Sequence, residues 1–189
     1  MTTSAVRICS NALLMLGDDP INSFSDNNVQ ATLAQNLWPQ VRDAVLRMHP
    51  WNCAVKRVQL APDASTPAFD WAYQFTLPGD LMRVLSVGEL CENIDYALES
   101  GKVVTDEALV NLRYVFRNEN VASWDSLLVH AATAAMAEAM AYPRTKSASV
   151  QETMGAKLKF WLQQAKTIDG QEAPTEDITD APLLEVRAI

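Results

Sequence analysis

The chain has 189 residues, of which 49% are hydrophobic and 20% are charged, and its formal net charge is −8. This length and balance fit one globular domain with an attachment. The charge argues against a protein that holds nucleic acid tightly, because that task needs clustered Lys and Arg and the densest basic stretch is the pair Lys56-Arg57. It suits a channel wall along which DNA slides, although the same charge is common in proteins unrelated to DNA.

The cysteines and the start of the chain indicate the compartment. Cys9, Cys53 and Cys91 are far apart and odd in number, so they form neither a disulfide framework nor a C-x-x-C metal or redox motif. Residues 1–4 do not begin a signal segment, and no apolar run approaches the roughly 18 residues that span a bilayer. We therefore expect a chain made in a reducing cytoplasm, with no membrane association, no metal and no cofactor.

The first predicted helix covers residues 3–17. Apolar residues recur there at three- and four-residue spacing, which places them on one helix face: Ala5, Ile8, Cys9, Ala12, Leu13 and Leu16. Thr3 or Ser4 can cap the start of this helix. Gly17 is expected in the left-handed conformation just past its end.

The second predicted helix covers residues 25–49. Ser25 or Asp26 can cap its start, and the pair His49-Pro50 should end it, since the residue before a proline avoids the helical conformation. Pro39 lies inside this helix and predicts a kink or two abutting helices. The stripe expected to be buried consists of Val29, Leu33, Leu37, Val41, Ala44 and Met48.

Strands are predicted within residues 54–117. Aromatic and apolar residues alternate with other residues over 71–77, which is the two-residue repeat of a half-buried strand. Further extended segments are predicted at 81–87, 96–98, 102–104 and 110–117. Ser100-Gly101 is the expected tip of a hairpin. We expect one small antiparallel sheet that covers an end of a helical bundle, with the aromatic strand packed on helices.

The two closing helices are predicted over residues 123–142 and 149–169. Ser123 is the expected cap of the first of these helices, and Pro143 is its expected stop. Alanine richness in the first helix should let a neighbouring helix approach closely. Ser149 and Glu152 have capping-box spacing at the start of the second, and Gly170 is its expected end.

The composition changes after Gly170. Five acidic residues of this segment face a single basic residue, Arg187: Glu172, Glu176, Asp177, Asp180 and Glu185. The final residues, 182–189, are mostly apolar and favour extended structure. Such a segment is either a docking arm that orders on a partner or a frayed tail.

The overall prediction is an α+β fold that is mainly α. It has a bundle of about four helices, a small antiparallel β-sheet with a hairpin, and an extended C-terminal arm. The body domain is expected over residues 1–169 and the arm over 170–189. The arm residues expected to touch a partner are Pro182, Leu183, Leu184, Val186, Arg187 and Ile189.

Motifs of catalysis are largely missing from the sequence. His49 flanks a Pro-Trp pair and His130 lies in an alanine-rich helix, so each is interpreted as a structural histidine. No nucleophile elbow, phosphate-binding glycine loop or H-E-x-x-H motif is present. Glu138, between two alanines, is the best candidate for the acid of a carboxylate-based hydrolase, but helix geometry more simply places it on the polar face. No residue is therefore assigned a catalytic role.

Three segments together resemble a known family. They are CSNALLMLGDDPINSFSD at the start, RDAVLRMHPWNCAVKRVQLAP where a helix ends in His-Pro-Trp and becomes a strand, and the aromatic strand and turn WAYQFTLPGDLMRVLSV. Their order and spacing, with the hairpin and the two closing helices after them, resemble the phage tail tubular protein A and head-to-tail connector (adaptor) family. The resemblance spans roughly the whole chain, although no single motif decides it.

The resemblance implies a structural role in a tailed phage. Members of that family form a ring, usually of twelve subunits, beneath the portal at the head-to-tail interface of the virion. The expected partners are further copies of this chain, the portal protein, and a tail, nozzle or head-completion protein, with DNA passing through the channel without sequence-specific binding. The C-terminal segment of the family commonly reaches the portal, which matches the arm after Gly170. Some relatives are linked to peptidoglycan cleavage, so a virion-borne hydrolase is the alternative.

Overall fold

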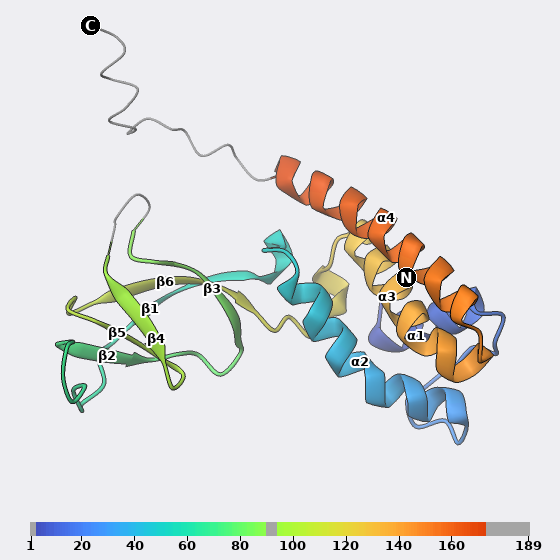
Figure 1. Ribbon diagram of the computed structural model, residues 1–189, viewed down its shortest axis with the longest axis horizontal. Coiled ribbons are helices and arrows are strands. Elements are labelled where there is room, and N and C mark those ends of the chain that lie inside the picture. The colour runs from blue at the N-terminus through green and yellow to red at the C-terminus, as the bar shows by residue number, and fades with distance from the viewer. Residues whose placement is uncertain (1–2, 90–93, 173–189) are drawn as a thin grey trace, which may run out of the picture.

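The computed structural model describes residues 3–89 and 94–172 (Figure 1). The predicted fold class is confirmed, because four α-helices accompany antiparallel strands in these residues. The helices are α1 Ala5–Met15, α2 Val29–Arg47, α3 Ser126–Thr145 and α4 Ala148–Glu172, with short 3-10 turns η1 Asn52–Ala54 and η2 Val121–Ser123. The strands are β1 Val55–Leu60, β2 Tyr73–Thr76, β3 Leu81–Val87, β4 Tyr96–Glu99, β5 Lys102–Thr105 and β6 Val110–Phe116.

The first two helices follow the predicted caps in part. In α1 the Ser4 hydroxyl accepts a hydrogen bond from the Arg7 N–H at 3.2 Å, and Gly17 has φ +75°, so both predicted ends are confirmed. The helix α2 begins later than predicted. Its cap is Asn28, whose side-chain oxygen accepts from the Ala31 N–H at 2.7 Å and thereby satisfies one free amide of the first turn.

The predicted cap at Ser25 or Asp26 is wrong, and of the two alternatives at Pro39 the pair of abutting helices is excluded. The carboxylate of Asp26 closes the loop before the helix, where it accepts from the N–H groups of Asn22 at 2.8 Å and Ser23 at 3.2 Å. The helix runs through Pro39 as one element rather than as two abutting helices. The Pro39 ring is exposed, so it meets no packed neighbour and the carbonyl that lacks a donor can be hydrated. The predicted end at His49-Pro50 is confirmed.

The buried stripe of α2 also differs from the prediction. Val29 is 66% exposed and Met48 is 47% exposed, and Ala44 is exposed as well. The predicted Leu33, Leu37 and Val41 are partly buried and pack against the core, and the residues fully buried in it are Ala31, Ala34, Trp38, Val45 and Leu46. Both sets of residues fit a period of 3.6, so periodicity alone does not choose between them. Packing against α3 and the residues just before it decides which face of α2 is buried. Trp38 meets Trp124, which precedes α3, with ring centroids 6.1 Å apart.

The cap and the stop of α3 correct the sequence prediction. Asp125 is the N-cap, and its carboxylate accepts from the Leu127 N–H at 2.7 Å, whereas Ser123 belongs to the preceding turn η2. The helix passes Pro143 and ends at Lys146, which is left-handed with φ +55°. Pro143 sits in the last turn, so the missing amide leaves one carbonyl of the preceding turn without its helical donor and only two further residues of the helix follow.

The helix α4 is longer than predicted at both ends. Its first turn is met by the Ser147 hydroxyl, which accepts from the Val150 N–H at 3.4 Å, so the predicted capping box from Ser149 is wrong. The helix continues through Gly170 to Glu172, and Gly170 is not left-handed. The predicted helix end at Gly170 is therefore wrong, because the described helix includes Gly170 and reaches Glu172.

Two small sheets replace the one that was predicted. Their strand orders are β1-β6-β3 and β2-β5-β4, and all pairs are antiparallel. The two sheets enclose a core of their own, which we call the β core, built around Phe75, Val103, Leu112 and Tyr114. The aromatic strand β2 belongs to the second sheet, β2-β5-β4, and packs on the first sheet, β1-β6-β3. This corrects the prediction that it packs on helices. The predicted hairpin is confirmed, and Ser100 and Gly101 both have positive φ, as a tight two-residue turn requires.

Strand β6 links the β core to the helical core. Its alternation sends Leu112 and Tyr114 into the β core, while Val115 belongs to the helical core with Leu13, Leu46 and other bundle residues. The first sheet therefore lies between the bundle and the second sheet (Figure 1). Figure 1 also shows α4 running along α3, with its C-terminal end at the end of the bundle nearer the strands.

Candidate functional site

The predicted arm residues Pro182, Leu183, Leu184, Val186, Arg187 and Ile189 lie outside the described residues. Their role as a docking segment therefore stays a prediction. The described structure contains the base of this segment, which is the last turn of α4.

The last turn of α4 is held by a cluster that we call the α4 anchor, formed by His49, Asn52 and Asp169. The carboxylate of Asp169, which is only 9% exposed, accepts from the Asn52 N–H at 3.0 Å and contacts His49 Nε2 at 3.2 Å. The Asn52 side chain donates to the Asp169 carbonyl at 2.9 Å. These contacts bridge about 120 residues of sequence and fix the end of α4 on the turn that leads into β1.

The His-Pro-Trp turn holds the other half of this anchor in place. Trp51 is fully buried, its indole N–H donates to the Val45 carbonyl at 2.9 Å, and its ring meets His49 edge-on at 4.8 Å. A buried carboxylate is stable only when donors surround it. The turn supplies two such donors to Asp169, at His49 and Asn52, so the sequence H-P-W-N creates the site that α4 occupies.

The electrostatics of the anchor favour a structural role over catalysis. Burial lowers the pKa of His49 below its usual value, and nearby Lys166 and Arg83 act in the same direction, while Asp169 opposes the shift without reversing it. Burial, aided by the charge of Asp169, raises the pKa of Cys53 to about 11. A thiol with this pKa stays protonated at neutral pH and is a poor nucleophile. The sequence interpretation of His49 as structural agrees with this geometry.

A second candidate surface is the exposed side of α2. We call it the neutral α2 face and define it by Val29, Thr32, Leu33, Asn36 and Gln40. Residues 27–41 contain no Asp, Glu, Lys or Arg, in a chain with 38 such residues. Asn27 to Asn36 line a hollow of about 440 Å³ on this side. An exposed helix face without charge, carrying a largely solvent-accessible valine, is typical of the centre of a protein–protein interface.

A third candidate site is a hollow that contains two carboxylates. Glu138 of α3 and Glu152 of α4 both line a space of about 470 Å³, together with Lys159. The Gln151 side-chain amide donates to Glu138 Oε1 at 3.3 Å. Glu138 is partly buried where the two helices meet, so it does not lie on the fully polar face that the sequence suggested. This is the arrangement that the hydrolase alternative would use.

The remaining chemistry of the described residues is limited. His130 is exposed and stacks on Trp161 with ring centroids 4.8 Å apart, which fits a structural histidine. Within residues 3–89 and 94–172, no group of three or more His, Cys, Asp or Glu side chains is placed to hold a metal ion. In that same part of the chain, no helix combines the length and the apolar character needed to cross a membrane.

Comparison with known proteins adds no relative. The chain matches no model of a protein family and no curated protein. The connector resemblance therefore rests on the sequence segments that carry it.

The lowered pKa of His49 predicts how the stability of the protein depends on pH. The unfolded chain binds a proton at His49 more tightly than the folded chain does, so stability falls as the pH drops from about 6.5 through the folded pKa. We expect His49→Gln to reduce the loss of unfolding free energy between pH 7.5 and pH 5, measured by urea denaturation. Gln164→Asn, an exposed change on α4 that removes no titratable group, is the control and should leave the slope unchanged. Equal slopes for H49Q and the unmodified chain would contradict this assignment.

Proposed function

We propose that this chain is the structural subunit of a head-to-tail connector ring in a tailed phage. In this role the body forms the ring beneath the portal and extends the DNA channel, and the segment after α4 attaches the ring to the portal. A tail, nozzle or head-completion protein would bind the other side of the ring. The protein would thus act at the head-to-tail interface of the virion.

The main support for the proposal is the contact at the α4 anchor between the His-Pro-Trp turn and the last turn of α4. The His-Pro-Trp turn belongs to the most specific of the segments that resemble the connector family, and it holds Asp169, three residues before the end of α4. A connector that binds its portal through a C-terminal arm needs the arm to leave from a fixed point. The anchor supplies such a point, and ordering on the portal would then cost only the conformational entropy of the arm itself.

The charge of the chain also supports the proposal. A net charge of −8 and the lack of a dense basic stretch along the sequence suit a wall that repels passing DNA and does not retain it. A ring further requires two different subunit surfaces that meet head to tail. The neutral α2 face is the candidate for one of these surfaces, because burying it desolvates no charged group.

The first prediction from this role concerns the arm. A chain that ends at Glu172 should fold with the same thermal midpoint as the full chain but should no longer bind purified portal rings. The pair Leu183→Asp and Leu184→Asp in the full chain is the matched variant, since it keeps the length of the arm and removes its apolar end. Both should abolish decoration of portal rings in electron micrographs. Full decoration by either variant would contradict the docking role.

The second prediction concerns the ring contact. Val29→Glu places a charge at the exposed valine of the neutral α2 face, and we expect it to prevent ring formation on portals while the monomer stays folded. Gln35→Glu is the control, because it adds the same charge to an exposed position on another side of the same helix. Analytical ultracentrifugation and microscopy of the mixtures provide the readout. Normal rings from V29E would remove this face from the interface.

The hollow that holds Glu138 and Glu152 supports a second candidate function, a virion-borne peptidoglycan hydrolase that uses two carboxylates. A zymogram of the purified protein on cell-wall material tests it. Clearing that disappears with Glu138→Gln and with Glu152→Gln, but persists with the exposed control Glu119→Gln, would establish the enzyme. Our first proposal predicts no clearing by the unmodified chain.

A further inference from the structure

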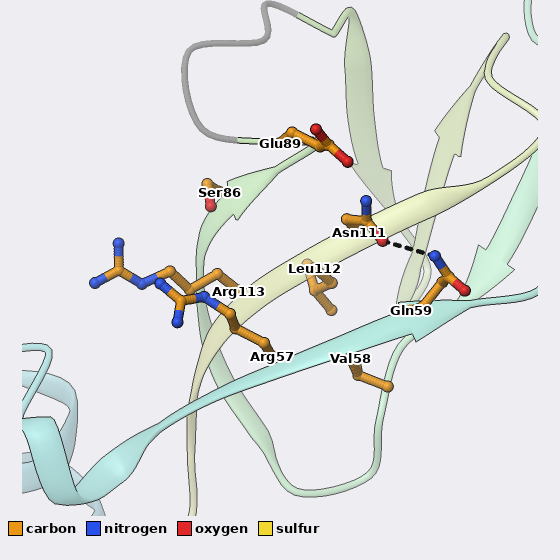
Figure 2. Close-up of a pocket in the computed structure, with 9 residues that line it drawn as sticks. Arg57, Val58, Gln59, Ser86, Glu89, Asn111, Leu112 and Arg113 are labelled. Carbon is orange, nitrogen blue, oxygen red and sulfur yellow. Dashed lines mark hydrogen bonds between the residues drawn. The ribbon is translucent and has the colours of Figure 1, made fainter.

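An arginine-bearing surface lies on the open part of the first sheet. Arg57 of β1 and Arg113 of β6 are paired directly across the strands, so both side chains leave the same face of the sheet. Figure 2 shows the two guanidinium groups side by side, pointing away from the sheet in the same direction. They line a hollow of about 460 Å³ together with Gln59 and Asn111, whose side chains are hydrogen-bonded at 3.1 Å.

A third arginine continues this surface toward the bundle. Arg83 of β3 is paired with Val115, which lies on the same face of β6 as Arg113 and one step nearer the helices. The three arginines therefore stand on the three adjacent strands β1, β6 and β3, and we call them the arginine row. Arg57 and Arg83 form no hydrogen bond or ion pair with any described residue, whereas Arg113 has a partner of its own.

Two members of the arginine row, Arg57 and Arg83, have no acidic partner among the described residues. Like charges directly opposite each other on paired strands destabilise a sheet unless a counter-charge lies between them. The other cations near the sheet are neutralised by local acids, as Lys56 is by Asp80 and Lys102 is by Asp63, each at 2.7 Å. Glu89 also lines the hollow, but Figure 2 shows it well away from the two guanidinium groups.

The end of α4 lies close to one end of this row. Arg47, in the last turn of α2, donates a side-chain hydrogen bond to the carbonyl of Met82, the neighbour of Arg83 in β3, and His49 just after α2 contacts Asp169 at 3.2 Å. Glu172 ends α4 three residues later, and the chain continues with Glu176, Asp177 and Asp180. Crossing from β3 to β1 spans two inter-strand spacings, about 10 Å, while eight extended residues reach about 27 Å. The acidic stretch is thus long enough to cross the row and starts beside it.

We propose that the acidic stretch of residues 172–180 docks on the arginine row of its own subunit. The carboxylates of this stretch supply the counter-charge that Arg57 and Arg83 do not find within residues 3–89 and 94–172, and guanidinium–carboxylate pairs can form two parallel hydrogen bonds. Docking holds the beginning of the arm against the body and leaves residues 182–189 free for another partner. This inference goes beyond the connector role and concerns the isolated subunit, so its test needs no portal.

Cleavage of the full-length chain by a glutamate-specific protease tests the proposal. In low salt, cleavage after Glu176 should be slower than in a free peptide of residues 171–189, because cleavage follows the undocked population. Arg57→Glu should speed this cleavage roughly threefold to tenfold, because it removes one exposed ion pair and places a like charge opposite the acidic stretch. Salt at 0.5 M should have the same effect on the unmodified chain, after correction for the rate on the free peptide.

The control is Lys159→Glu, which makes the same charge change on α4 in a different hollow and should leave the rate unchanged. Arg57 is exposed, so R57E should keep its thermal midpoint. If R57E unfolds, the effect of salt on cleavage of the unmodified chain tests the docking proposal without it. Cleavage as fast as in the free peptide, or no effect of both R57E and salt, would overturn the proposal. A further contrary outcome is that the protein is retained on duplex DNA, and that R57E abolishes this retention without changing the cleavage rate. The arginine row would then bind phosphates, and the docking proposal would be overturned.

Discussion

The buried carboxylate of Asp169 is the interaction on which the placement of the C-terminal segment depends. It joins three elements that are far apart in sequence, namely the end of α2 at His49, the turn η1 at Asn52 and the last turn of α4. Without partners, a buried carboxylate is strongly unfavourable, so the three elements must come together for it to be stable. The exit of the chain from the body is therefore determined by the core and not by the arm.

The same turn also connects the bundle to the strands. On its other side, the Asn118 side-chain amide donates to the Cys53 carbonyl at 2.7 Å and to the Ser123 hydroxyl at 2.9 Å. The turn η1 is thus held by α4 through Asn52 and by the segment after β6 through Cys53. Since β6 contributes to both the helical core and the β core, a shift of the strands would be transmitted to the base of the arm. The helical bundle, the first sheet and the last turn of α4 are therefore connected through the turn η1.

Local features of the sequence predict most of the elements. The two-residue alternation of 110–116 and the pair Ser100-Gly101 identify β6 and the hairpin, since these signals involve neighbouring residues only. Caps are harder to predict, because Ser25, Asp26 and Asn28 offer the same chemistry and only the loop geometry selects Asn28. The buried stripe of α2 and the second sheet were missed for a similar reason: tertiary packing decides which face of an amphipathic element is covered.

The candidate site was largely hidden from sequence reasoning. Asp169 carries no local signal and is recognised only by its contact with a turn 117 residues earlier. Arg57 and Arg113 are unremarkable until the register of β1 and β6 places them opposite each other. The H-P-W motif was visible, but its role as the receptor for α4 required the fold.

Amide hydrogen exchange of Asp169→Ala, compared with the unmodified chain, tests the role of the anchor most directly. Hydrogen bonds to a charged group contribute about 1.5–3 kcal/mol, so their loss should raise exchange in the last turn of α4 at least about tenfold. The Asn52 amide should be deprotected as well, while the middle of α3 and strand β6 keep their protection. Unchanged protection of residues 166–172 in the variant would contradict the claim that Asp169 fixes the point from which the C-terminal segment leaves.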